Sequence, residues 1–113
     1  YLTAGRRKDA DERRDYPVRV SDIDIFDHMN NSVYWSVVED YLADHPELMR
    51  APLRVVIEHD LPVALGDRLE ILTHTHPAGS TDRFGAELSD RTVTTLTYLV
   101  GEETKAVACV FPL

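Results

Sequence analysis

Apolar residues recur at helical spacing in one part of the chain, residues 32–42. Two rows of apolar side chains, each spaced four residues apart, run side by side there: Val33, Val37 and Tyr41, and Tyr34, Val38 and Leu42. A stripe of this width predicts a helix with one face buried in the core. Asn30 or Asn31 is expected to cap its start, and Pro46 to end it, because proline disfavours helix at the residue before it.

The rest of the chain is rich in β-branched residues, and turn residues divide it into short segments. The predicted strands cover residues 16–20, 53–61, 67–76, 83–89, 92–100 and 105–111. A single helix accompanied by antiparallel strands is an α+β arrangement. A sheet that wraps around the helix would cover the wide apolar stripe, so the sequence predicts one long central helix inside an antiparallel sheet.

The length of 113 residues, of which 43% are hydrophobic and 28% charged, suits one globular domain. No apolar run approaches the roughly 18 residues that a membrane helix needs, so no membrane span is expected. Cys109 is the only cysteine, which excludes an internal disulfide and fits a reducing compartment; we therefore expect a cytoplasmic protein. The chain begins with Tyr1 rather than methionine, which suggests a processed or excised piece.

The net charge is −8, and its distribution separates two parts of the chain. Residues 1–20 hold six basic and four acidic side chains (+2), and residues 21–113 hold six basic and sixteen acidic ones (−10). An acidic body argues against a nucleic-acid partner, which needs a basic footprint. Residues 1–15 carry nine charges and few apolar side chains, so they are interpreted as a charged linker or arm, with the domain at 16–113.

Five basic residues cluster in this arm: Arg6, Arg7, Lys8, Arg13 and Arg14. They form the one place where an acidic partner could dock. The alternative, a solvated linker of mixed charge, is favoured because charged segments usually have that role.

The densest group of polar residues immediately precedes the predicted helix. It holds three carboxylates, one imidazole and two amides within ten residues: Asp22, Asp24, Asp27, His28, Asn30 and Asn31. The first N–H groups of a helix lack intrahelical partners and lie at the positive end of its dipole, so they can stabilise an oxyanion. Asp24 or Asp22 could act as a general base or attack a carbonyl, and His28 could transfer a proton. These groups suit hydrolysis of an activated acyl compound without a cofactor; alternatively, they only cap a helix and a turn.

Three other chemistries have less support. A calcium loop over this segment would need glycine at its sixth position and glutamate at its twelfth, where the chain has Asp27 and Val33. His74 and His76 share one face of a predicted strand, but no third ligand is evident, so surface histidines are favoured over a metal site. The chain has no Gly-x-Ser-x-Gly elbow, and Cys109 lies in an apolar run typical of a packed core thiol.

Residues 21–34, with an Asp-x-Asp run followed by His-Met-Asn-Asn and an aromatic residue, resemble the signature of hot-dog-fold thioesterases. They are most similar to the C-terminal half of acyl-acyl-carrier-protein (acyl-ACP) thioesterases. Residues 61–67, Leu-Pro-Val-Ala-Leu-Gly-Asp, resemble the Pro-Ala-x-x-Gly-Asp turn of hot-dog enzymes. The resemblance implies a single hot-dog domain that pairs with a second one, as a tandem half or in a dimer, and binds a fatty-acyl thioester between the two.

The same resemblance implies roles for individual residues. Those expected to act in catalysis are Asp24, His28 and Asn30, and those expected to bind substrate are Phe26, Met29 and Asn31. Asp24 would activate water, His28 would assist proton transfer, and backbone N–H groups from His28 to Asn30 would hold the oxyanion. Plant-type acyl-ACP thioesterases have a catalytic asparagine at the place of Phe26. They also have a downstream Glu-Cys pair, for which residues 62–64 offer no counterpart and Glu58 or Asp60 is a possible replacement.

The leading functional hypothesis is hydrolysis of a fatty-acyl thioester, on acyl carrier protein rather than coenzyme A, with release of a free fatty acid in fatty acid biosynthesis. A non-catalytic acyl-binding or pairing module is an alternative, motivated by Phe26 and the apolar residues 62–64. An acyl-CoA thioesterase and a hydratase that uses an Asp–His pair on an enoyl thioester are two others.

Overall fold

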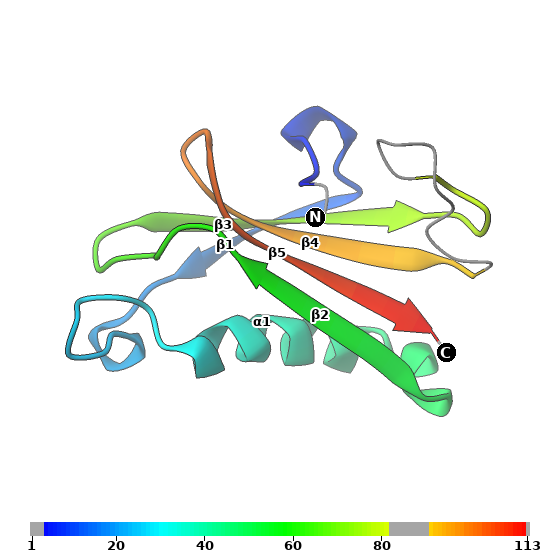
Figure 1. Ribbon diagram of the computed structural model, residues 1–113, viewed down its shortest axis with the longest axis horizontal. Helices are drawn as coiled ribbons and strands as arrows, with labels where there is room; N and C mark the ends of the chain where they lie inside the picture. The colour runs from blue at the N-terminus through cyan, green and yellow to red at the C-terminus, as the bar shows by residue number, and fades with distance from the viewer. Residues whose placement is uncertain (1–3, 82–90, 113) are drawn as a thin grey trace.

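The computed structural model describes residues 4–81 and 91–112. A single long helix, α1 (Asn31–Asp44), covers one face of a five-stranded antiparallel sheet (Figure 1). The strands lie in the order β1-β3-β4-β5-β2 and comprise β1 (Glu12–Pro17), β2 (Leu53–His59), β3 (Arg68–His76), β4 (Val93–Val100) and β5 (Glu103–Pro112). Three short 3-10 helices complete the described elements: η1 (Arg7–Asp9), η2 (Val20–Asp22) and η3 (Pro46–Arg50). The predicted α+β hot-dog arrangement is therefore confirmed.

The core lies between α1 and the concave face of the sheet. Val33, Val37 and Val38 of the helix are buried there. They belong to one apolar cluster with alternate residues of the central strands: Leu69, Ile71, Leu96, Tyr98, Ala106, Ala108 and Val110. The fully buried Tyr98 also donates a hydrogen bond from its hydroxyl to the backbone oxygen of Tyr34, at 2.6 Å. Helix and sheet are thus joined by a buried polar contact as well as by apolar packing.

The helix has the predicted extent, but its start is held differently from the prediction. Asn30 occupies the N-cap position without a capping hydrogen bond from its side chain, and Asn31 is already the first helical residue. Instead, the backbone N–H of Asn30 donates to the backbone oxygen of Asp22 at 2.8 Å. At the other end, His45 is the C-cap and Pro46 follows, as predicted. The expected side-chain caps are therefore wrong, because a backbone contact with the preceding loop fixes the helix start.

The predicted strands 53–61, 67–76, 92–100 and 105–111 correspond to β2, β3, β4 and β5, with each end displaced by at most two residues. The predicted strand 83–89 lies outside the described residues. The strand expected at 16–20 is wrong: β1 begins at Glu12 and ends at Pro17, and η2 follows it. Residues 12–15, assigned to the linker from their charge, are thus part of the sheet.

β1 lies at the edge of the sheet, which explains how so highly charged a segment forms a strand. β1 pairs with β3 from Glu12 opposite Thr73 to Pro17 opposite Arg68, and the described structure has no strand on its other side. Every residue of β1 except Tyr16 is exposed. An edge strand needs backbone pairing on one side only, and charges or proline along it discourage further pairing.

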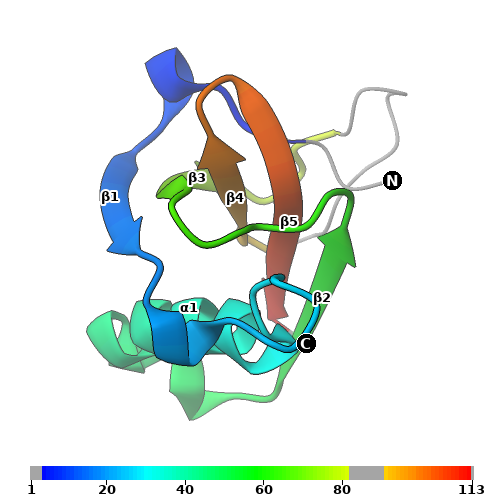
Figure 2. The ribbon, with the colours of Figure 1, turned by 90° about the vertical axis from the view of Figure 1, so that its left-hand side faces the viewer.

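Residues 5–10, here called the N-terminal strap, lie on the face of the sheet opposite α1 (Figures 1 and 2). The backbone N–H of Gly5 donates to Thr97 Oγ1 at 2.9 Å, and His74 Nε2 lies 2.9 Å from the backbone oxygen of Arg6. A Cβ atom on Gly5 would lie 2.0 Å from the His74 ring, so only glycine fits there. His74 is consequently buried beneath the strap, which corrects the expectation of a surface histidine.

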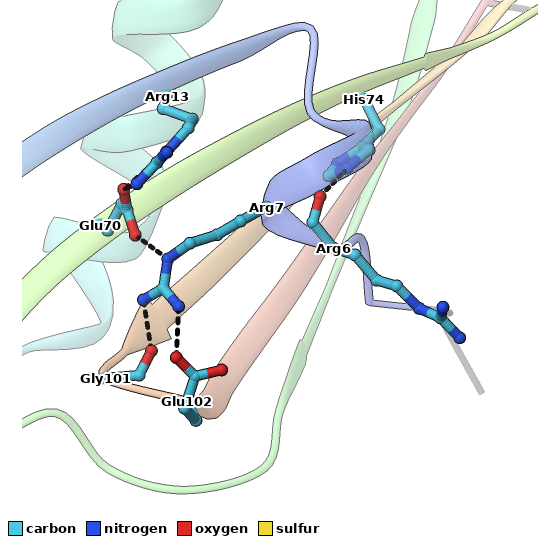
Figure 3. Close-up of polar contacts among 7 residues, drawn as sticks. All are labelled: Arg6, Arg7, Arg13, Glu70, His74, Gly101 and Glu102. Atoms are coloured by element: carbon cyan, nitrogen blue, oxygen red, sulfur yellow. Dashed lines mark hydrogen bonds and ion pairs between the residues drawn. The ribbon is translucent and has the colours of Figure 1, made fainter.

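Ion pairs fasten the strap to the sheet (Figure 3). Arg7 donates to Glu70 at 2.8 Å, to Glu102 at 2.6 Å and to the backbone oxygen of Gly101. Arg13 donates to the other oxygen of Glu70 at 2.8 Å. The hydrogen bond from Arg7, reinforced by Arg13, holds the pKa of Glu70 below its ordinary value. Together with an Arg14–Asp44 pair at 3.6 Å, these contacts engage three of the five residues of the basic cluster within the protein itself.

Replacing Arg7 by alanine is expected to release the strap while the sheet stays folded. Arg7 supplies three of the contacts that hold the strap, whereas the side chain of Arg6 points away from the sheet (Figure 3). Hydrogen exchange should therefore lose protection at Gly5 in Arg7→Ala and keep it in the matched control Arg6→Ala. Unchanged protection in Arg7→Ala would show that the strap is held by its backbone contacts alone.

Cys109 is buried on the same face as the strap, and the prediction of a packed thiol is confirmed. Burial raises its pKa, and its sulfur lies 3.5 Å from Thr95 Oγ1. A buried thiol with a raised pKa is a poor nucleophile. Separately, within the described ranges no helix has the length and apolar character that crossing a membrane requires.

Candidate active site

A tight loop just before α1 positions the residues singled out from the sequence. Asp24 Oδ1 accepts hydrogen bonds from the backbone N–H groups of Phe26, at 2.8 Å, and His28, at 3.1 Å. The backbone N–H of Asp24 in turn donates to the oxygen of His28 at 2.8 Å. Asp27, at the loop tip, has a φ of 61°, a left-handed conformation that aspartate tolerates better than most residues. The Asp24 carboxylate therefore fixes His28 relative to itself.

The Pro-Val-Ala-Leu-Gly-Asp turn supports this loop from the side. The backbone N–H of Met29 donates to the oxygen of Val63 at 2.7 Å. Within the turn, Asp67 Oδ2 accepts from the N–H of Ala64 at 2.9 Å, and Gly66 takes a φ of 90° that favours glycine. Figure 2 shows the loop and the turn together at one end of the molecule, beside the end of β2. The two sequence signatures are thus joined directly in space.

An open hollow of about 280 Å³ lies between the loop, the start of α1 and the end of β2. Polar and apolar side chains both line it, the polar ones being carboxylates, imidazoles and an amide. The lining residues are Asp24, His28, Met29, Asn31, Tyr34, His59, Asp60, Leu61 and Pro62. Acid–base groups gathered in a concave site are the usual mark of an active or binding site.

Four of the six predicted site residues meet in this hollow: Asp24, His28, Met29 and Asn31. His28 and Asn31 are exposed, Asp24 is half-buried, and Met29 is buried beneath them. Phe26 does not line the hollow; its side chain is 72% exposed at the loop tip. Asn30 does not line it either; it is the N-cap residue, and its backbone N–H donates to Asp22.

The backbone groups expected to hold an oxyanion are not available. The N–H of His28 donates to Asp24 Oδ1, that of Met29 to Val63, and that of Asn30 to Asp22. This corrects the prediction, because the loop pairs with its neighbours before the helix begins. The next amide, that of Asn31, has no hydrogen-bond partner among the described residues and lies at the positive end of the helix dipole.

His59 and Tyr34 were not assigned to the site from the sequence. The sequence places Tyr34 in the apolar stripe of the helix and at the end of the recognised signature; it is indeed buried, and burial raises its pKa. Its ring lies edge-on to the ring of His59, with centroids 4.6 Å apart. Asp60, considered as a replacement for the family's glutamate, also lines the hollow. The position of His59 beside Asp60, at the end of a strand leading into the recognised turn, was the signal that could have identified it.

His74 and His76, which the sequence offered as possible metal ligands, lie outside the hollow. Both project from the strap side of β3, where His74 contacts Arg6 and His76 Nε2 lies 3.0 Å from Thr95 Oγ1. Burial lowers the pKa of His76, and the nearby His74 acts in the same direction. Within the ranges that the structure describes, no three His, Cys, Asp or Glu side chains are arranged to hold a metal ion.

Known proteins are similar to this chain in sequence or in fold. Uncharacterized proteins of two Mycobacterium tuberculosis strains are 41% identical over 61 residues, which is 54% of this chain and 24% of each relative. A Thermus thermophilus thioesterase solved with coenzyme A and Zn superposes with a TM-score of 0.62 at 22% identity, covering 89% of this chain and 78% of that one. The 12:0-ACP thioesterase of Umbellularia californica superposes with a TM-score of 0.67 at 18% identity, covering 98% of this chain and 38% of that one.

At these identities the two solved structures establish the fold. The match covers only about a quarter of the length of the curated relatives. The family itself follows from the sequence model of the acyl-ACP thioesterase C-terminal domain, which matches residues 5–112. The chain therefore has the hot-dog fold and belongs to the acyl-ACP thioesterase C-terminal domain family.

Proposed function

We propose that the hollow beside α1 hydrolyses fatty-acyl thioesters and releases a free fatty acid. The observation that carries this proposal is that Asp24 and His28 share one hollow. Among the described residues, moreover, Oδ2 of Asp24 has no hydrogen-bond partner. A carboxylate with one oxygen fixed by the backbone and the other open to solvent is well placed to act as a general base.

The reaction uses one water and no cofactor. Asp24 accepts a proton as the water oxygen attacks the thioester carbonyl carbon, and the carbonyl oxygen becomes an oxyanion. The oxyanion then collapses, the carbon–sulfur bond breaks, and the thiolate leaves with a proton delivered through His28. The N–H of Asn31, at the start of α1, is the backbone donor for the oxyanion. Asn30 serves indirectly by fixing the start of the helix.

The remaining predicted residues contact the acyl thioester rather than the attacking water. Met29 and Asn31 line the hollow, where they would touch the thioester itself. Phe26 and Ile25 project from the loop tip with 72% and 91% of their side chains exposed. In our proposal they contact the acyl chain where it leaves the hollow, because large exposed apolar side chains beside a site favour an apolar ligand.

A second hot-dog unit is part of the proposal, as a tandem half or in a dimer. β2 is an edge strand, and its run Val55-Val56-Ile57 is only half-buried. Described residues of β2 include no proline or bulge that would prevent another strand from pairing with it. Pairing there would place the second unit next to the hollow, which begins at the last residue of β2.

Acyl carrier protein is the proposed carrier, because the family model that matches is that of acyl-ACP thioesterases. The full-length protein should be assayed with dodecanoyl-ACP and dodecanoyl-CoA under the same conditions. We expect kcat/KM to be at least about tenfold higher with the carrier protein, since contacts remote from the reacting atoms add binding energy in the transition state. A higher value with dodecanoyl-CoA would identify an acyl-CoA thioesterase instead.

A non-catalytic acyl-binding module is the second candidate. Phe26 stands where the plant-type pattern has a polar catalytic group, and its side chain lies outside the hollow. Such a module would bind dodecanoyl-ACP without releasing free thiol, whereas the enzyme proposed above releases it.

A further inference from the structure

His59 carries an imidazole in the hollow and has no role in the reaction steps proposed above. It is the last residue of β2 and is exposed to solvent. Its side chain lines the same hollow as Asp24 and His28, from the strand rather than from the loop. The hollow is thus bordered by ionisable groups from two separate elements.

The backbone at the end of β2 is firmly fixed. His59 lies opposite Ala106 in the β2–β5 ladder. Immediately after it, the N–H groups of Asp60 and Leu61 both donate to the backbone oxygen of Lys105, at 2.9 and 3.0 Å. Because both sides of the residue are anchored to β5, the Cβ of His59 has a defined position relative to the hollow.

The ring of His59 is also oriented. It packs against the Tyr34 ring at a centroid distance of 4.6 Å and an interplanar angle of 78°. Tyr34 is 3% exposed, and its backbone oxygen accepts the hydroxyl of Tyr98. Among the described residues, neither ring nitrogen of His59 has a hydrogen-bond partner. Both nitrogens are therefore open to a molecule in the hollow, on a ring whose packing is already settled.

An oxyanion in this hollow needs such a donor. The N–H groups of His28, Met29 and Asn30 are engaged by protein oxygens, which leaves the amide of Asn31 as the backbone donor at the helix start. An oxyanion is usually stabilised by two or more preorganised donors. An imidazole has at least one N–H in both its neutral and its protonated form, so it can be the second donor in either state.

We propose that His59 is a catalytic residue that donates a ring N–H hydrogen bond to the thioester carbonyl oxygen as it becomes an oxyanion. This inference rests on the proposed hydrolysis. His59 transfers no proton: Asp24 takes one from water, the carbon–sulfur bond breaks, and the thiolate leaves with a proton. The hydrogen bond strengthens as negative charge develops on the oxygen, so its effect falls on kcat rather than on KM.

Two substitutions in the full-length protein separate the hydrogen bond from the packing. His59→Phe keeps a ring against Tyr34 but has no donor, and His59→Gln keeps a donor without the ring. With dodecanoyl-ACP we expect His59→Phe to lower kcat about 100-fold with little change in KM, and His59→Gln to stay within about tenfold of the wild type. His45→Phe is the matched control, because His45 stacks on Tyr41 at the other end of α1; its kcat should be unchanged. Equal kcat in His59→Phe and wild type, or equal losses in both His59 variants, would overturn the proposal.

A binding measurement distinguishes failure of this inference from failure of the proposed function. The probe is a dodecanoyl-CoA analogue in which a negatively charged tetrahedral phosphonate replaces the thioester carbonyl, so that its oxygens mimic the oxyanion but it is not hydrolysed. His59→Phe should bind it about five- to tenfold more weakly than wild type. If the wild type binds the probe without hydrolysing any thioester and His59→Phe weakens binding, the contact stands and hydrolysis is contradicted. If the wild type hydrolyses thioesters and the variant matches it in kcat and probe affinity, hydrolysis stands and the role of His59 is overturned.

Discussion

Asp24→Asn is expected to lower kcat for acyl-thioester hydrolysis about 10²- to 10⁴-fold, the range that a general base contributes. Asparagine keeps the Oδ1 that accepts the N–H groups of Phe26 and His28, so the loop should hold its conformation. It loses the carboxylate that takes the proton from water. Release of free thiol from dodecanoyl-ACP, followed with a thiol reagent, measures the loss.

Asp27→Asn is the matched control for this change. Asp27 is exposed in the same loop, and asparagine tolerates its φ of 61° at least as well as aspartate does. The control should keep kcat within about twofold, since an exposed carboxylate away from the hollow has no part in the reaction. Wild-type kcat in Asp24→Asn would reduce Asp24 to a turn residue and remove the base from the proposed mechanism.

Tyr98→Ala is expected to cause the largest loss of stability, about 3–5 kcal/mol, the cost of removing a large buried aromatic side chain. Tyr98 is fully buried in β4, and its ring packs 5.3 Å from that of Tyr34. A domain of this size has a total stability of about 5–15 kcal/mol, so the variant should be marginally folded at best. Urea unfolding followed by circular dichroism measures the change.

Tyr98→Phe isolates the hydrogen bond from the packing. It keeps the ring but leaves the backbone oxygen of Tyr34 without the 2.6 Å hydrogen bond from the hydroxyl. The expected cost is about 1–3 kcal/mol, the penalty for an unsatisfied buried polar group. Because Tyr34 supports His59 at the hollow, this variant should also lower kcat. A stability loss below about 0.5 kcal/mol, the scatter of ordinary surface substitutions, would show that the contact contributes nothing.

Local patterns predicted the elements whose faces differ sharply in polarity. The two apolar rows of α1 face the sheet as expected, and β2 to β5 lie close to their predicted positions. The first four residues of β1 were not predicted, because residues 12–15 are all charged and do not show the alternation of apolar and polar residues that marks a strand. The pairing of β1 with β3 depends on backbone hydrogen bonds at an edge, which side-chain pattern does not encode.

The residues of the site also differ in whether local sequence is enough to predict them. Asp24 and His28 are four residues apart in one loop, so a local motif was enough to bring them together. His59 reaches them only through the register of β2 against β5, and register is a tertiary property that a single strand does not reveal. The prediction that backbone N–H groups from His28 to Asn30 hold the oxyanion was wrong. The N–H of Met29, for example, donates to the distant Val63, and the local sequence at the helix start does not reveal that contact.

The most direct measurement of the central claim is the product balance of the full-length protein with dodecanoyl-ACP. Catalysis at the Asp24–His28 hollow predicts free dodecanoic acid and free carrier thiol in equal amounts, over many turnovers per protein molecule. Both products should be lost together in Asp24→Asn. Saturable binding of dodecanoyl-ACP with neither product released would contradict the account and identify a binding module.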